Sequence, residues 1–179
     1  TPPDDMIGIR ELWSGMHGAH RGKQYLVCVP FKTHAWPAEY RRTVPDTIVG
    51  TDKWGQNWLL ATTGLPRVVF GTTPGAMNDA PIYFKQACVS KRSVKGVGHG
   101  VCWASNNGLC YHGQRGTFIL TERLLSKAAW RALVPSTIIG ANWGDWYIGF
   151  YDDGQRKGFM VNTVQPDGII WLTQGAYGV

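Results

Sequence analysis

Cysteine is scarce in this sequence, and its spacing argues against two common kinds of stabilising site. The four cysteines lie far apart and form no C-x-x-C pair, so neither a zinc site nor a disulfide framework is indicated. Two of them fall within short apolar runs, as small core residues do. We therefore expect buried free thiols in a reducing compartment. The four are Cys28, Cys88, Cys102 and Cys110.

Catalytic motifs are also absent. The sequence has no nucleophile elbow, no phosphate-cradling glycine loop and no dinucleotide fingerprint. His17 and His20 lie three residues apart in a glycine-rich stretch without a metal-ligand partner, and we interpret them as exposed loop residues. Asp152 and Asp153 precede Gly154, which favours a turn over a pair of catalytic carboxylates. We expect a protein that is not an enzyme and that uses no metal or cofactor.

Long apolar runs are missing, and acidic residues are in deficit. No run approaches the roughly 20 residues of a membrane helix, and no secretion signal is recognisable. The 18 Lys and Arg outnumber the 12 Asp and Glu, and the net charge of +6 attracts anionic partners. The basic residues occur in loop pairs, which are either solvated or in contact with a partner such as DNA. The pairs are Arg41 with Arg42, Lys91 with Arg92, and Arg156 with Lys157.

Glycine and aromatic residues are abundant, and they alternate as short strands and turns. Gly50, Gly96 and Gly140 mark equivalent points of a unit that recurs about every 45 residues. A repeat of this length with three or four short strands is typical of propeller blades. We predict an all-β fold of β-propeller-like repeats, with three to four blades. They form a single domain over residues 1–179, either complete or a fragment of a longer subunit.

The two ends of the chain depart from this plan. Residues 1–5 are polar and contain proline, so we expect a loose tail. Because the first residue is Thr1 rather than Met, we expect a processed chain or one cut from a larger protein. Residues 7–13 and 25–29 are expected to form a hairpin, followed by an extended connection over residues 30–45. A last strand is expected over residues 168–173.

One segment, near residues 126–134, predicts a short helix between blades. Ser126 is a suitable N-cap before an alanine-rich stretch, and Pro135 follows the segment closely. Trp130 is expected to face the sheet and to serve packing rather than ligand binding.

The nine tryptophans divide into two groups. Trp58, Trp103 and Trp146 lie in strands of three successive units, so we expect them at equivalent positions between blades. Three others lie near turns and are candidate contact aromatics for a ligand or a partner. These are Trp36, Trp54 and Trp143.

Several positions carry turn chemistry. The Asn107–Gly108 dipeptide predicts a tight type I′ hairpin turn, in which both residues have positive φ. Replacing Gly108 with Val is therefore expected to lower stability. The structural turn residues are predicted to be Gly64, Asn107, Gly108 and Gly154.

Four motifs occur in the order in which a phage virion family carries them. They are residues 35–41 (AWPAEYR), 60–66 (LATTGLP), 86–93 (QACVSKRS) and 103–109 (WASNNGL). Over residues 6–152 the sequence resembles the tail nozzle or hub proteins of short-tailed bacteriophages, which bear a propeller and extend the portal channel. The most specific piece is CVSKRS, at residues 88–93.

The sequence departs from this family in three ways. Ser-Asn-Asn-Gly at residues 105–108 replaces Ser-Pro-Asp-Gly and keeps the turn chemistry. Ala129 stands where relatives often have Glu or Gln, so the helix lacks a capping box. Family members are also considerably longer.

The resemblance implies a structural protein of the virion tail, assembled in the bacterial host cytoplasm. Its partners would be other copies in a ring around the DNA channel, the portal or adaptor and other tail proteins, with passing double-stranded DNA as a further contact. Candidate residues facing a neighbouring subunit or DNA are Lys91, Arg92, Arg41 and Arg42. The alternative is a carbohydrate- or receptor-binding propeller module, with loop aromatics such as Trp36 and Trp143 stacking on the ligand.

Overall fold

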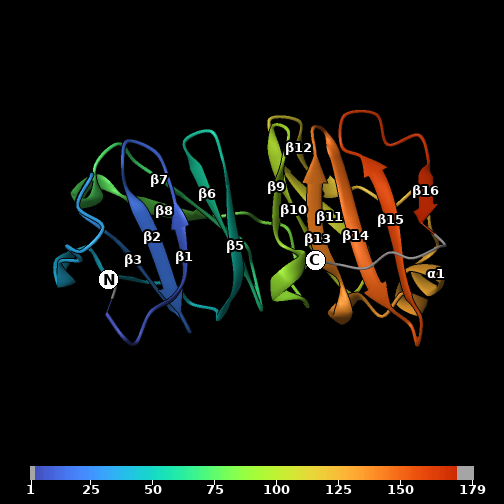
Figure 1. Cartoon of the computed structure of the whole chain (residues 1–179), viewed down its shortest axis with the longest axis horizontal. Helices are drawn as coiled ribbons and strands as arrows, with labels where there is room; N and C mark the ends of the chain where they lie inside the picture. Colours follow the sequence, from blue (N-terminus) through green and yellow to red (C-terminus); the bar gives the residue numbers. More distant parts are fainter. Residues whose placement is uncertain (1–2, 173–179) are drawn as a thin grey trace.

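A computed structural model describes residues 3–172 of the chain. They form four four-stranded antiparallel sheets, which follow one another along the sequence and are called blades 1 to 4 (Figure 1). Within each blade, strands that are neighbours in sequence pair with each other. The predicted all-β, propeller-like fold with three to four blades is confirmed.

The blades have these strands. Blade 1 contains β1 (Ile7–Glu11), β2 (His17–Arg21), β3 (Gln24–Val27) and β4 (Arg42–Thr43). Blade 2 contains β5 (Ile48–Trp54), β6 (Asn57–Thr62), β7 (Arg67–Phe70) and β8 (Asn78–Pro81). Blade 3 contains β9 (Lys95–Val97), β10 (Gly100–Ala104), β11 (Leu109–Gly113) and β12 (Gly116–Ile119). Blade 4 contains β13 (Ile139–Trp143), β14 (Trp146–Asp152), β15 (Arg156–Asn162) and β16 (Ile169–Leu172).

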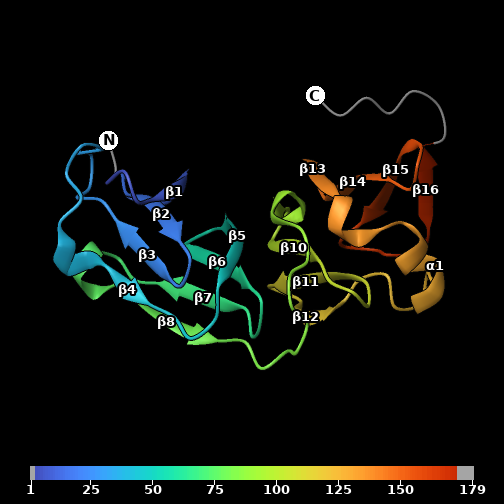
Figure 2. The ribbon, with the colours of Figure 1, turned by 90° about the horizontal axis from the view of Figure 1, so that it is seen from below.

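The four blades form an open arc, with blades 1 and 4 at its two ends (Figure 2). The first strand of each blade lies on the inner side of the arc. Strand β9 lies beside both β5 and β13, and β1 lies beside β5. The first strands of all four blades therefore surround a common axis.

The glycines that mark the repeat lie where these inner strands approach one another. A Cβ atom on Gly50, Gly96 or Gly140 would lie only 2.7, 2.5 or 2.8 Å from the backbone carbonyl oxygen of Lys91, Lys53 or Ser93, respectively. All three glycines belong to the described residues, and none of them has a positive φ. Glycine is therefore required because neighbouring backbone approaches these positions closely. The glycines recur about every 45 residues because the inner strand of each repeat is crowded in the same way.

Apolar cores lie between successive blades, and the second strands of blades 2 and 3 each contribute to two of these cores. Trp58 packs toward blade 1 while Leu59 packs toward blade 3. Trp103 packs toward blade 2, and its neighbour Cys102 packs toward blade 4. This alternation follows from the period of two along a strand.

Trp146 does not occupy the position equivalent to Trp58 and Trp103, so this prediction is wrong. In blade 4 the buried residue that faces blade 3 is Tyr147, which is fully buried. Trp146 is one residue earlier and lies half-buried on the opposite face, where it pairs with Trp143. A shift of one residue in a strand moves a side chain to the other face.

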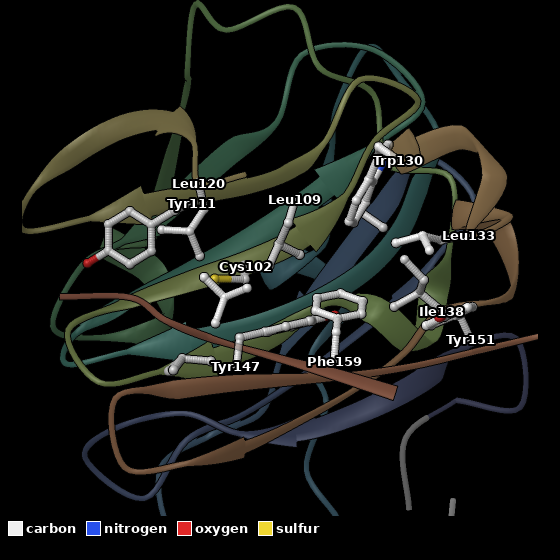
Figure 3. Close-up of a cluster of buried hydrophobic side chains, with 13 residues drawn as sticks. Cys102, Leu109, Tyr111, Leu120, Trp130, Leu133, Ile138, Tyr147, Tyr151 and Phe159 are labelled. Carbon is white, nitrogen blue, oxygen red and sulfur yellow. The ribbon is translucent and has the colours of Figure 1, made fainter. Parts of the chain in front are cut away.

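The predicted helix is confirmed as α1 (Lys127–Ala132), which contributes to the core between blades 3 and 4 (Figure 3). The hydroxyl of Ser126 accepts a hydrogen bond from the backbone N–H of Ala129 at 3.1 Å, so Ser126 is the N-cap. Trp130 is 1% exposed and donates its indole N–H to the carbonyl of Ser105 at 2.8 Å. Its ring packs edge-on against Phe159.

The first blade differs most from its sequence-based prediction. His17 and His20 are not exposed loop residues, because both belong to strand β2, which separates β1 from β3. The predicted hairpin is therefore two hairpins, and β2 escaped detection because its sequence, HGAHR, has no apolar alternation. The extended connection after β3 contains the short 3₁₀ helix η1 (Ala38–Tyr40) before β4.

Two further 3₁₀ helices precede strands. η2 (Pro74–Ala76) lies within blade 2, between β7 and β8, and η4 (Pro135–Thr137) lies between blades 3 and 4, before β13. Of the predicted loose tail, Thr1 and Pro2 fall outside the described residues, as does Thr173 of the predicted last strand. Asp5 forms an ion pair with Arg41 at 2.8 Å.

The turn at Asn107–Gly108 is real, but its predicted type is wrong. Neither residue has positive φ, and strands β10 and β11 are joined by a four-residue loop over residues 105–108. The backbone N–H of Ser105 donates to the carbonyl of Gly108, and the hydroxyl of Ser105 accepts from the N–H of Asn107. Gly154, in contrast, has a φ of +100° in the turn formed with Asp152 and Asp153.

All four cysteines are buried free thiols, as predicted. Burial raises the pKa of the Cys88 thiol to about 11 and that of Cys110 to about 12. Over residues 3–172 there is no helix of the length and apolarity that a membrane crossing requires.

Candidate functional site

One hollow of the described structure lies at the axis of the arc. This axial pocket has a volume of about 300 Å³ and is lined by the first strands of all four blades together with η3 (Lys91–Ser93). Five of its lining residues are basic, and none is acidic. The basic residues are Arg10, His20, Lys91, Arg92 and Lys95.

The CVSKRS segment builds one wall of this pocket. The hydroxyl of Ser90 donates to the carbonyl of Ile138 at 2.7 Å, which ties the segment to the start of blade 4. Ser93 is fully buried, and its hydroxyl donates to the carbonyl of Ser90 at 2.7 Å and accepts from the N–H of Ala104 at 2.9 Å. The two serines thus fix a tight 3₁₀ turn and leave Lys91 and Arg92 exposed at the pocket.

A buried carboxylate connects the inner strands beside the pocket. Asp52 is 6% exposed and forms an ion pair with Arg10 of blade 1 at 3.1 Å. Its other oxygen accepts from the N–H of Gly96 in blade 3 at 2.9 Å. Asp52 therefore joins three blades, and a buried charge with such partners is stable because each oxygen is satisfied.

His20 is the most enclosed basic residue of the pocket. It is 2% exposed, and its Nδ1 atom is buried without a hydrogen-bond partner among the described residues. Burial lowers the pKa of His20 to about 4, with further lowering by the charges of Lys91 and Arg10. The imidazole is therefore neutral at pH 7 and can donate one N–H.

The other predicted basic pair lies elsewhere. Arg41 and Arg42 follow η1 in blade 1, outside the axial pocket, so the structure does not bring them together with Lys91 and Arg92. The Arg41 guanidinium binds Asp5 at 2.8 Å and Gln24 at 3.0 Å, and the hydrogen bond to Arg41 lowers the pKa of Asp5. Arg42 donates to the carbonyl of Glu39 at 2.6 Å. The Arg41 side chain thus binds the N-terminal segment and β3, whereas Arg42 binds its own loop.

The three candidate contact aromatics differ in exposure. Trp36 is half-buried and donates its indole N–H to the carbonyl of Thr33 at 2.8 Å. Trp54 is half-buried and packs edge-on against His112. Trp143 is 69% exposed, at the end of β13. Of the three, Trp143 alone presents most of its ring to solvent.

Gly64, the remaining predicted turn residue, lies in the loop between β6 and β7. A Cβ atom there would lie 2.3 Å from a carboxylate oxygen of Asp46, and its φ is not positive. The backbone N–H of Gly64 donates to the hydroxyl of Thr62 at 3.1 Å. The close approach of the Asp46 side chain, rather than an unusual φ, therefore explains why this residue is glycine.

Sequence reasoning missed the pocket residues Arg10, His20 and Lys95, and it missed Asp52 beside the pocket. A usable signal was present, because Arg10 and Asp52 each lie two residues after a glycine near the start of an inner strand, Gly8 and Gly50. Aligning the repeats at these glycines would have placed Arg10 and Asp52 at equivalent positions of their inner strands. In the described part of the chain, no three His, Cys, Asp or Glu side chains are grouped so as to hold a metal ion.

Comparison with solved structures supports the fold. The chain matches a structure of a Saccharomyces cerevisiae Dbp5 variant bound to Nup159, a Gle1 variant, IP6 and ADP, with a TM-score of 0.54 and 10% identity. The match covers 93% of this chain and 43% of that one, so the chain spans less than half the length of this neighbour. At such low identity the likeness concerns the fold alone.

Two further solved structures are more distant. The N-terminal domain of Nup159 matches with a TM-score of 0.46 and 8% identity, over 94% of this chain and 61% of that one. PorZ, a surface component of the type IX secretion system of Porphyromonas gingivalis, matches with a TM-score of 0.42 and 10% identity, over 98% and 28%.

Sequence comparison provides no family. No family model matches the chain, and no curated protein matches it. The four blades define the class of the molecule as a β-propeller module. The resemblance to phage tail nozzle proteins stays a prediction.

Proposed function

We propose that this chain is a structural component of the tail of a short-tailed bacteriophage, nozzle- or hub-like, and forms part of a ring around the DNA channel. The ordered motifs at residues 35–109 support the tail. The structural observation that carries the proposal is an apolar sheet face at the end of the arc that no residue of the range 3–172 covers, because such a face needs a partner.

This open face of blade 4 is turned away from blade 3. Its centre is the cross-strand row of Ile148, Met160 and Ile170, one residue from each of three adjacent strands. Ile170 is 49% exposed, and Ile148 and Met160 are half-buried. The face also includes Phe150, Trp146 and Trp143.

The equivalent faces of blades 2 and 3 are covered by the next blade. Leu59 and Ala61 of blade 2, and Cys102 and Ala104 of blade 3, are fully buried. The outer face of blade 1 is covered differently, since Ala19 and Leu26 are buried beneath Trp36 of the following loop. The open face of blade 4 therefore corresponds to the faces of blades 2 and 3 that pack against the next blade. A further β-sheet is the partner that fits it.

A rigid wall is the mechanical role that this architecture supports. Each blade is locked to the next by an apolar core, and the inner strands are joined by backbone contacts and by Asp52. Burying apolar area contributes about 25 cal/mol per Å², so repeated sheet interfaces resist deformation. In a ring of copies, such modules keep a channel open while the open faces mediate assembly.

Two measurements test the proposal. Purified virions of the phage whose genome encodes this chain should contain its peptides in the tail by mass spectrometry, and a tail without them refutes the assignment. The purified protein should form ring-like oligomers by light scattering and electron microscopy, and the Met160→Lys, Ile170→Lys double variant should not. The matched control, Tyr83→Lys with Val164→Lys, changes exposed apolar residues outside the open face and should assemble normally. A wild-type protein that stays monomeric at high concentration contradicts the ring.

Trp143 favours carbohydrate recognition as a second candidate function. Its ring is 69% exposed and lies beside Trp146, an arrangement suited to stacking on a sugar. If this function holds, a glycan array should give saturable binding that Trp143→Ala abolishes. An array without any hit would remove this alternative.

A further inference from the structure

We propose that the axial pocket binds a phosphate group, held by Lys91, Arg92, Lys95 and Arg10. The inference concerns the pocket within one chain, and it does not depend on the tail assignment. Inorganic phosphate or diphosphate and the terminal phosphate of an oligonucleotide share the chemistry that the pocket recognises.

The first observation is an excess of positive charge in a confined space. Arg10, Lys91, Arg92 and Lys95 come from blade 1, η3 and blade 3 and line one cavity of about 300 Å³. The neighbouring carboxylate, Asp52, balances a single cation, Arg10. Like charges held together repel, and a multivalent anion relieves that repulsion better than a carboxylate does.

The second observation is that most of the side-chain donors at this pocket have no acceptor among the described residues. Within residues 3–172, the side chains of Lys91, Arg92 and Lys95 make no hydrogen bond or ion pair, whereas Arg41 and Arg67 each bind a carboxylate. The Nε atom of Arg10 is buried and unpartnered. Buried donors without acceptors are costly, so an occupant that accepts hydrogen bonds is expected.

The third observation is the buried imidazole of His20. It is 2% exposed, lines the pocket and keeps Nδ1 without a partner in the described structure. It is packed near Gly8 and faces the cations Lys91 and Arg10, with no acidic residue among the pocket-lining groups. A neutral imidazole donor beside fixed cations suits an oxyanion and disfavours a metal cation.

The shape of the pocket also favours a compact anion. Glycines at three lining positions, Gly8, Gly50 and Gly140, let neighbouring groups approach the inner strands closely, which keeps the cavity small. Lysine contributes point charges, and arginine can bind two oxygens of one phosphate through its planar fork. A phosphate or diphosphate uses both types of donor.

The test is a calorimetric titration of the purified chain with sodium diphosphate at pH 7, compared with sodium sulfate and sodium chloride at matched ionic strength. We expect saturable, one-to-one binding of diphosphate, weakened at least about tenfold in Lys91→Ser, Arg92→Ser. The control, Lys32→Ser with Lys127→Ser, removes two exposed lysines outside the pocket and should change the affinity by less than about twofold. No saturable binding, or equal weakening in both double variants, overturns the proposal.

A second readout guards against misfolding of the double variant. In wild-type protein, the NMR titration of the His20 ring should move to higher pH when diphosphate is added, since a bound anion favours the imidazolium. The single variant Lys95→Ser should reduce this movement, and an unmoved His20 titration at saturating diphosphate refutes the site.

Two oligonucleotides then distinguish the sources of the phosphate. If a 5′-phosphorylated thymidine octamer displaces diphosphate and the unphosphorylated octamer does not, the site binds a terminal phosphate. If neither displaces diphosphate, the site holds the free anion. Displacement by both to the same extent, with a steep dependence on salt, points to diffuse backbone attraction and overturns a built phosphate site.

Discussion

Replacing Gly108 with alanine separates two explanations for this glycine. A Cβ atom at Gly108 would lie 2.3 Å from Cγ2 of Ile119 and 2.8 Å from Oγ1 of Thr121. The hydroxyl of Thr121 accepts the backbone N–H of Leu109, so a displaced Thr121 would also lose that bond. The glycine is needed for space, not for a positive φ.

The expected magnitude follows from two opposing terms. Overpacking a well-packed site costs about 1–3 kcal/mol, and removing a glycine from the unfolded chain returns about 0.4–1 kcal/mol. We therefore expect Gly108→Ala to lose about 1–2 kcal/mol of unfolding free energy and to lower Tm by roughly 2–8 °C. Urea unfolding followed by tryptophan fluorescence measures the free energy directly.

Two further variants make this prediction sharp. Gly108→Asn should cost at least as much as Gly108→Ala, whereas at a positive-φ site asparagine would be tolerated better than alanine. Adding Ile119→Ala to Gly108→Ala should recover stability relative to the sum of the single changes, because it removes Cγ2. A tolerated asparagine together with strictly additive single changes would refute the steric explanation.

Three other predictions follow from buried groups. Trp130→Ala should lower the free energy of unfolding by about 3–5 kcal/mol. Trp130→Phe should lower it by only about 1–3 kcal/mol, because it keeps the contact with Phe159 and loses only the hydrogen bond to the Ser105 carbonyl. Urea unfolding measures both. Because the pKa of His20 is lowered to about 4 in the folded protein, the stability gained by burying the neutral imidazole is fully present above the ordinary histidine pKa near 6.5. This stability is lost as the pH falls toward 4. The free energy of unfolding should therefore fall by up to about 3 kcal/mol between pH 7 and pH 4.5. The variant His20→Gln should show a weaker dependence on pH over this range. Since burial raises the pKa of Cys88 and Cys110, iodoacetamide at pH 8 should leave both unmodified by mass spectrometry until urea unfolds the protein, and rapid labelling of the native state would contradict their burial.

Local patterns predicted the repeat and the short helix correctly. The glycine spacing identified the blades because the same crowding of inner strands recurs in each, and Ser126 with Pro135 bounded α1 through short-range capping and steric rules. Strand β2 escaped because its side chains have no periodic pattern, and the face of Trp146 was misassigned because one residue of register decides it.

The candidate site was only half visible in the sequence. Lys91 and Arg92 stood out as an adjacent basic pair in an unusual segment, but nothing local links them to Arg10, which lies far away along the chain. Nor could the sequence separate them from Arg41, which is bound by Asp5, and Arg42, which is bound by its own loop. Basic pairs look alike until their partners are known.

The sequence by itself determined the kind of molecule: a chain of short antiparallel strands, repeated about every 45 residues, whose glycines, turns and alternating apolar residues act locally. Only the tertiary structure decided what lies together. The order of the blades around one axis brings Arg10, His20 and Lys91 to the same pocket, and blade 4 lies at the end of the arc, where no described element covers its open face. The reason is physical, because which side chains meet across an axis depends on how successive sheets pack, and packing joins residues that are distant along the chain.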